Sequence, residues 1–402
     1  MNGERMDLLR TRAALSRMFE PSDNVGLALV EAAGPGDALR VATGAIRAGE
    51  ALTREVLEVL TAAGIPATGN SLSSALERWI TRVPDLAPDR DLSMIGRAGG
   101  ELLIPEDSRW PEALRDLGLG MPLCLWTRGD LSKGIPALHQ TAAVVGSRDS
   151  TGYGASVTGD ISAGLVTRGW TVVSGGAYGI DAQAHRAALV TGSQARIPTI
   201  AVMACGVDRY YPAGNEELLR EVVRHGLLLS EVPPGSAPTR WRFLQRNRII
   251  AALSAVTVVV EARWRSGALN TAHHAAALGR EVGAVPGSVY SANSAGCHRL
   301  LRDGSAVCVT DAAEIVELGS PIGSTGDAAE STHEEVKAVH DGLTIEDMLL
   351  LDALPLRSGS LVEKLASVAG LSVSAVRAGL ARLELEGLAA RDGPDKWRRS
   401  RG

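Results

Sequence analysis

Seven short apolar runs, rich in β-branched residues, alternate with segments of helical composition between about residues 97 and 318. The runs are AAVVG at 142, WTVVSGG at 170, TIAVMACG at 199, GLLLSEV at 226, AVTVVVEA at 255, EVGAVPG at 281 and SAVCVTD at 305. Such alternation indicates βαβ units and a mostly parallel sheet with helices on both faces. Near-continuous apolar strands fit that burial. The sequence therefore predicts an α/β, Rossmann-like core over 97–318.

The segments on either side of this core follow other patterns. Residues 1–93 read as short helices, one broken by Gly-Pro-Gly at 34–36, which predicts a helical module of the SAM or helix-hairpin-helix kind. Residues 319–340 are rich in Gly, Ser, Thr and acids, which is typical of a flexible linker. Residues 341–402 read as three helices and a hairpin turning near 392–393. That outline predicts a winged-helix domain.

Composition limits what the chain can bind and where. The net charge of −5 argues against a surface coated in positive charge, so any contact with nucleic acid has to be local. Aromatic residues make up only 3% of the chain, so composition does not support an aromatic platform for stacking bases. No signal-peptide pattern and no apolar run of about 18 residues occur, so a cytoplasmic protein without a membrane span is expected.

The residue types that most often hold metals or cofactors are poorly placed for that task. The four cysteines have no metal-knuckle or redox spacing and are expected to be buried, reduced thiols: Cys124, Cys205, Cys297 and Cys308. His273 and His274 have no third ligand at useful spacing. No Walker sequence and no G-x-G-x-x-G followed by an acid is present. We therefore expect no metal and no cofactor.

Two of the predicted strands end in small-residue turns. The first turn holds Gly146, Ser147 and Arg148, and the second holds Gly175 and Gly176. Ligands in open α/β sheets collect outside the carboxyl ends of strands, where glycine backbone and helix N-termini favour anions. Ser147 and Arg148 add a hydroxyl and a bidentate donor suited to phosphate. The alternative is that these glycines only form tight turns.

A basic cluster in RFLQRNRIIAALS, at 242–254, is the most unusual feature of this acidic chain. It comprises Arg242, Arg246 and Arg248, with Arg240 just before it, and it is followed after the next strand by Arg263, Arg265, Ser266 and Gly267. On a helix, Arg246 and Arg248 would diverge by about 200°. On a turn before the helix, both could reach one phosphate-binding surface. The alternative is a set of ion pairs with nearby acids.

Two polar pairs near these turns have a structural and a functional interpretation. Asp181 and His185 share a helix face, and we interpret them as a helix cap and a packed or hydrogen-bonded histidine rather than an acid–base pair. Asp208 and Tyr211, in CGVDRYYPAGN, are interpreted first as loop-shaping residues and second as ligand contacts.

These blocks resemble the DNA-processing protein A (DprA/Smf) family. The similarity runs through VVGSR, SGGAYGIDAQAHRAAL, TIAVMACGVDRYYPAGN, RNRIIAALS and VVVEARWRSGALNTA in the family's order. The chain departs from the family pattern at Leu244, where proline is usual, at Arg240, where lysine is common, and at Ala268 and Asn270. The resemblance covers about 97–318.

The resemblance implies a cytosolic, non-catalytic protein that binds single-stranded DNA, delivers strands to the RecA recombinase during natural transformation and recombination, and forms a homodimer. By motif position its DNA pocket would contain Gly146, Ser147, Arg148, Gly175, Gly176, Arg246, Asn247, Arg248, Ser266 and Gly267. The C-terminal domain, with Ser372 or Ser374 capping its recognition helix and basic residues up to Arg401 in its wing, could contact duplex DNA or another protein.

Two other classes of protein stay open. A nucleotide-binding or nucleotide-cleaving enzyme of the phosphoribohydrolase kind could use a similar glycine-rich sheet, although AVPGSVYSANSAGC lacks the Pro-Gly-Gly-x-Gly-Thr stretch of those enzymes. A pure protein-interaction hub would leave the arginines unexplained.

Overall fold

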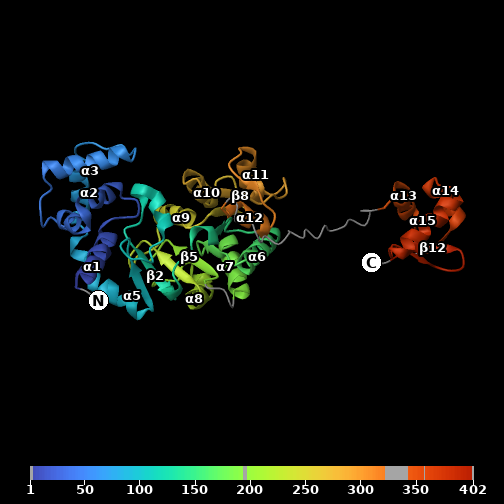
Figure 1. The fold of residues 1–402 in the computed structure, drawn as a ribbon, viewed down its shortest axis with the longest axis horizontal. Coiled ribbons are helices and arrows are strands. Elements are labelled where there is room, and N and C mark those ends of the chain that lie inside the picture. The colour runs from blue at the N-terminus through green and yellow to red at the C-terminus, as the bar shows by residue number, and fades with distance from the viewer. Residues whose placement is uncertain (1–2, 193–196, 322–342, 357, 401–402) are drawn as a thin grey trace. The chain divides into compact units, whose positions relative to one another are not determined.

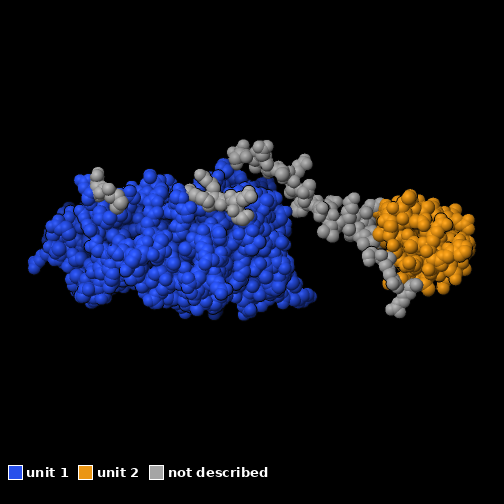
Figure 2. All heavy atoms as spheres, turned by 90° about the horizontal axis from the view of Figure 1, so that it is seen from below, with its two compact units in different colours: residues 1–328 blue, residues 329–402 orange. Residues whose placement is uncertain are grey.

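The structure is a computed structural model that describes residues 3–192, 197–321, 343–356 and 358–400. The chain divides into two compact units, Met1–Ala328 and Ala329–Gly402, coloured separately in Figure 2. Most of the predicted linker, 322–340, lies outside the described residues, as does Arg401. Over the described residues, no helix has the length and apolar character needed to cross a membrane.

The first unit is built on a nine-stranded sheet in the order β1-β2-β6-β5-β4-β3-β7-β8-β9. Every neighbouring pair from β6 to β9 is parallel, and β1 and β2 add an antiparallel edge. The strands are β1 (Gly100–Leu103), β2 (Leu125–Gly129), β3 (Thr141–Val145), β4 (Thr171–Ser174), β5 (Thr199–Met203), β6 (Leu227–Ser230), β7 (Val256–Val259), β8 (Glu281–Ala284) and β9 (Val307–Cys308). The predicted α/β class with a mostly parallel sheet is confirmed.

Helices cover both faces of this sheet, as the unbroken apolar strands predicted (Figure 1). One face carries α9 (Arg240–Ala252) and α10 (Gly267–Ala277), and the other carries α6 (Gly152–Thr167) and α7 (Ile180–Thr191). The remaining helices of the core are α8 (Glu216–His225), α11 (Ala295–Arg302) and α12 (Ala312–Gly319).

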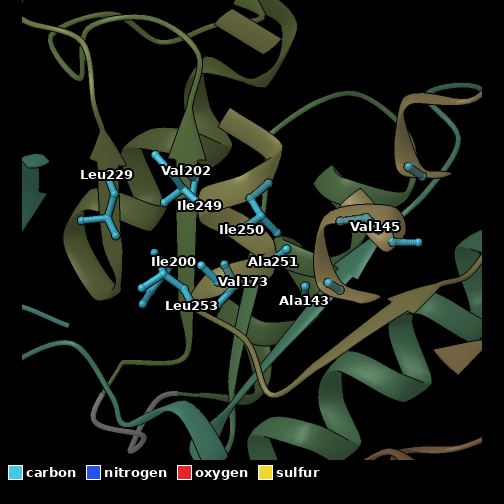
Figure 3. Close-up of a cluster of buried hydrophobic side chains, with 14 of the residues drawn as sticks. Ala143, Val145, Val173, Ile200, Val202, Leu229, Ile249, Ile250, Ala251 and Leu253 are labelled. Carbon is cyan, nitrogen blue, oxygen red and sulfur yellow. The ribbon is translucent and has the colours of Figure 1, made fainter. Parts of the chain in front are cut away.

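The two-residue period of the strands assigns alternate side chains to the two faces. Ala143 and Val145 of β3 pack with Ile249 and Ile250 of α9 (Figure 3). Ala142 and Val144 of the same strand belong to the cluster formed with α6 and α7. The core is therefore two apolar layers that share one sheet.

The order of the strands creates a switch point between β3 and β7. After β3 the chain adds β4, β5 and β6 on one side, and then returns to add β7 on the other side of β3. The connections leave β3 and β7 toward opposite directions, which opens a crevice at the carboxyl ends of these two strands.

Five helices precede the sheet: α1 (Gly3–Met18), α2 (Asn24–Ala42), α3 (Glu50–Ala62), α4 (Ser71–Ile80) and α5 (Pro88–Arg97). Leu9 and Ala13 of α1 and Ile95 of α5 pack in one cluster with Trp126 of β2. These helices and the sheet thus belong to one compact unit. The boundary between a 1–93 module and a 97–318 core, and the resemblance of that module to SAM or helix-hairpin-helix folds, stay predictions.

The described residues of the second unit form three helices and a three-stranded antiparallel sheet in the order β10-β12-β11. Its elements are α13 (Ile345–Ala353), β10 (Ser360–Leu361), α14 (Val362–Ala369), α15 (Val373–Leu385), β11 (Ala389–Arg391) and β12 (Lys396–Arg399). Ser372 Oγ accepts a hydrogen bond from Ala375 N and caps α15. The assignment as a winged helix stays a prediction.

The cysteines correct one expectation. Cys124, Cys205 and Cys297 are buried free thiols, as predicted, whereas Cys308 is exposed because the edge strand β9 is only two residues long.

Candidate functional site

A pocket of about 870 Å³ lies in the crevice at the carboxyl ends of β3 and β7. Its wall is formed by the loop after β3, the first turns of α9, and the loop that leads from β7 into α10. We call it the strand-end pocket. The predicted site residues that line it are Gly146, Ser147, Arg148, Arg240, Arg246, Asn247, Ser266 and Gly267.

The loop after β3 is held rigidly by a buried carboxylate. Glu261, which follows β7, accepts hydrogen bonds from Thr151 N at 2.9 Å and from Thr151 Oγ1 at 2.6 Å, and its backbone oxygen accepts one from Ser147 N at 2.7 Å. A Cβ at Gly146 would lie 2.5 Å from Ile180 Cγ1, so only glycine fits there. The loop therefore presents Ser147 and Arg148 from a fixed backbone.

Three arginines of the pocket are exposed and form no ion pair within the described parts of the chain: Arg148, Arg240 and Arg265. Arg148 instead lies over the ring of Phe243, with its guanidinium carbon 5.0 Å from the ring centroid. Arg263 also lines the pocket but pairs with the exposed Asp149 at 2.7 Å. A positive surface without its own counterions is suited to bind an anion.

A fourth arginine, Arg246, is buried in the floor of the pocket. Its Nη1 donates to Gly175 O at 2.7 Å and to Val202 O, at the ends of β4 and β5. Burial lowers the pKa of Arg246 to about 10, and the nearby Asp181 opposes that change. Burial also raises the pKa of Asp181, although the charge of Arg246 counteracts it. Arg246 is therefore still charged at neutral pH and adds positive potential at the floor of the pocket.

The N-terminus of α10 completes the pocket. Ser266 caps this helix by accepting from Ala268 N at 3.3 Å, and Gly267 is its first residue. Asn247 Nδ2 donates to Gly267 O at 3.3 Å and to Asn270 Oδ1 at 3.1 Å. Helix N-termini carry partial positive charge, so α10 favours an anion in the same place as the arginines.

Arg242 and Arg248, which the sequence assigned to the site, lie outside the pocket. Thr239 caps α9, so the helix begins at Arg240 and sends Arg246 and Arg248 in different directions. Arg248 forms a bidentate pair with Glu231 at 2.8 Å and 2.6 Å. Arg242 forms a similar pair with Glu20 at 3.0 Å and 2.9 Å. For these two residues, ion pairing with acids was the better interpretation.

Gly175 and Gly176 do not line the pocket either. A Cβ at Gly175 would lie 2.1 Å from Arg246 Nη1, and Gly176 adopts a φ of +67°. Their carbonyls accept hydrogen bonds from Arg246 and Asn215, respectively. Glycine is required here by packing and backbone conformation, which is the tight-turn alternative.

Sequence reasoning missed Phe243 in the pocket, and it gave ligand contact only as the second interpretation of Tyr211. Phe243 and Tyr211 both line the pocket, with ring centroids 5.8 Å apart. Phe243 precedes Arg246 by three residues, so a helix beginning before Arg242 would have placed both on one face. Leu244, where the chain departs from the family pattern, is exposed on the pocket wall.

The other polar candidates have structural contacts. His185 is fully buried, its Nδ1 lies 2.7 Å from Thr199 Oγ1, and burial lowers its pKa to about 3. Asp181 accepts from Ala177 N at 3.3 Å in the turn before α7. Asp208 accepts from Gly235 N at 2.9 Å. In the part of the chain that the structure describes, no group of three or more His, Cys, Asp or Glu residues could hold a metal ion.

The start of α9 is fixed by the loop after α1. Besides the Glu20–Arg242 pair, Trp241 Nε1 donates to Pro21 O at 3.2 Å, and Ser22 Oγ donates to Gln245 Oε1 at 2.5 Å. The N-terminal helices thus support the wall of the pocket that carries Arg240 and Phe243.

Known proteins are similar to this chain over most of its length. The family described as DNA recombination-mediator protein A matches residues 101–319. A Mycobacterium tuberculosis (strain H37Rv) protein provisionally named DNA processing protein DprA is 41% identical over 405 residues, 97% of this chain and 94% of that one. DNA processing protein DprA of Bacillus subtilis is 34% identical over 63% of this chain and 81% of its own length. The solved structure of DNA processing protein A from Streptococcus pneumoniae superposes with a TM-score of 0.58 and 27% identity, over 79% of this chain and 98% of that chain.

Proposed function

The chain belongs to the DNA recombination-mediator protein A family, and from this premise we propose that it binds single-stranded DNA in the strand-end pocket. The observation that carries the proposal is the convergence of Arg148, Arg240 and Arg265 on one pocket without carboxylate partners among the described residues. Arg246 and the N-terminus of α10 add to the positive potential. Phosphate is the anion that arginine binds in a bidentate manner.

The aromatic rings of the pocket favour a single strand over a duplex. Phe243 and Tyr211 lie beside the unpaired arginines, within a volume of about 870 Å³. In a single strand the faces of the bases are free to stack on such rings, whereas in a duplex they are covered. Phosphate contacts and stacking do not distinguish bases, so we expect little sequence preference.

The role of this binding in the cell is the second part of the proposal. We propose that the protein acts in the cytoplasm, as a homodimer, delivering single strands to the RecA recombinase during DNA uptake and recombination, without a catalytic step. The second unit would contact duplex DNA. Arg377 of α15 is exposed, whereas Arg382 is paired with Asp347 at 2.7 Å, so the contact would depend on Arg377 and the β11–β12 hairpin.

The test is equilibrium binding of fluorescent oligonucleotides, single- and double-stranded, over a range of salt concentrations. We expect the full chain to prefer the single strand, with a log–log salt slope of about −0.7 for each phosphate contacted. A chain ending before residue 343 should keep its affinity for the single strand and lose affinity for the duplex. A flat salt response, or release of the base from nucleoside monophosphates, would instead favour a nucleotide enzyme.

A further inference from the structure

The chain has 14 aromatic residues, and each of the exposed ones follows the carboxyl end of a parallel strand. Six aromatic side chains are between 42% and 97% exposed, and the other eight are buried or half-buried. In the spatial order of the strands β6, β5, β4, β3, β7 and β8, the residues after each carboxyl end are Trp241, Tyr211, Tyr178, Tyr153, Trp264 and Tyr290. One exposed ring thus follows each of six adjacent parallel strands.

We propose that these six rings form a stacking track along the carboxyl edge of the sheet, on which successive bases of one DNA strand lie as it enters and leaves the strand-end pocket. The inference rests on the proposed function and extends it from the pocket to the length of DNA bound.

Several rings are held in place before any ligand binds. Tyr153 donates its hydroxyl to Pro286 O at 2.6 Å, which ties the loop after β3 to the loop after β8. Tyr178 accepts from Gly214 N at 3.3 Å, between the loops after β4 and β5. Ordered rings bind at a lower entropic cost than mobile ones. Their exposure is therefore compatible with a ligand surface.

Positive charge accompanies the rings in the pocket and beyond β7. Arg148 and Arg265 follow β3 and β7, and the Arg299 guanidinium lies 5.2 Å from the centre of the Trp264 ring. Rings interleaved with arginines are typical of surfaces that bind single strands without sequence preference, because the rings take the bases and the arginines take the phosphates.

The track predicts a site size. Neighbouring strands lie about 4.8 Å apart, so six strands span about 24 Å. At about 3.4 Å per stacked base, this length accommodates at most about seven nucleotides, and fewer if the strand is stretched. Affinity should therefore rise with oligonucleotide length beyond what the pocket alone contacts, and then level off.

The experiment compares oligo(dT) probes of 4, 8, 12 and 20 nucleotides on full-length variants. The Trp264→Leu/Tyr290→Ala double variant should bind the 4-mer like the wild type and the 20-mer about 5- to 150-fold more weakly for each stacked base lost. The single variant Trp264→Phe, which keeps an aromatic ring at position 264, should bind the 20-mer with most of the wild-type affinity. Val190→Ala, an exposed apolar control at the far end of α7, should change nothing.

Two readouts separate this inference from the proposed function. Arg148→Ala should weaken binding at every length, because it acts in the pocket. The 20-mer should quench tryptophan fluorescence in the wild type and less in Trp264→Leu. An unchanged length dependence in the double variant, with Arg148→Ala still weakened, would overturn the track alone. A wild type that binds no oligo(dT) would overturn both.

Discussion

Arg248→Ala should destabilise the fold rather than weaken DNA binding directly. The Arg248 and Glu231 side chains are only 5% and 11% exposed and form a bidentate pair. Arg248 also donates to Gly120 O at 3.0 Å and to Gln245 O at 2.9 Å. It therefore joins α9 to the end of β6 and to the segment before β2.

The magnitude follows from what the substitution leaves behind. Alanine at 248 would leave the Glu231 carboxylate almost buried without a counterion, a change that costs about 3–5 kcal/mol. With a denaturant slope of about 3 kcal/mol per M, the urea midpoint should fall by about 1–1.7 M. An Arg248→Met/Glu231→Leu variant, which removes both charges, should recover most of this loss.

Urea unfolding followed by tryptophan fluorescence measures this effect, because six of the seven tryptophans lie in the first unit. Arg148→Ala is the matched control: it also removes one arginine, but an exposed one that forms no ion pair among the described residues. Our reasoning is refuted if Arg248→Ala unfolds at the wild-type midpoint and loses affinity for DNA, because Arg248 would then act as a phosphate ligand.

Three further outcomes are expected. Arg148→Ala should lower single-strand affinity about 10- to 100-fold and reduce the salt slope by about 0.7, with an unchanged urea midpoint; a parallel salt titration checks this. Gly175→Ala should weaken binding and lower stability, because its Cβ would displace Arg246. Gly96→Ala is the control, because its Cβ would meet no atom within 4 Å and its φ, like that of Gly175, is not in the left-handed region; the two urea midpoints are compared. Burial depresses the folded-state pKa of His185 to about 3, so its contribution to stability is present above about pH 6.5 and is lost as the pH falls toward 3. Between pH 6.5 and pH 4, the urea midpoint of the His185→Gln variant should therefore fall less than that of the wild type.

The sheet and its strand-end loops could be predicted from sequence because their signals are local. Each parallel strand is buried on both faces, so its apolar run is nearly continuous and easy to recognise. The rule that ligands bind at carboxyl ends then placed Gly146, Ser147, Arg148, Ser266 and Gly267 at one pocket, where the structure has them.

Which arginines line the pocket and which form ion pairs could not be predicted, because this depends on where α9 begins and on partners far away in the sequence. Thr239 starts the helix just before Arg240, so Arg246 and Arg248 point in different directions. Glu20 lies 222 residues from Arg242, and no local pattern reveals that pair. Gly175 is likewise explained only by Arg246, which is 71 residues away. Close contacts between distant segments are not encoded in local spacing.

The arginines of the pocket differ from those around it in a way that links stability to ligand binding. Arg242 and Arg248 are neutralised by glutamates, so their charges are balanced within the fold. In the pocket, burial is the main cause of the lowered pKa of Arg246, and the charge of Arg148 lowers it further, so like charges repel one another there. A bound phosphate chain would relieve that repulsion. The folded protein should therefore gain stability with oligo(dT) as RT ln(1 + [L]/Kd), about 2.7 kcal/mol at 100 times Kd. Arg148→Ala, which removes one of the contacts to phosphate, should leave the stability of the free protein unchanged and shrink that gain.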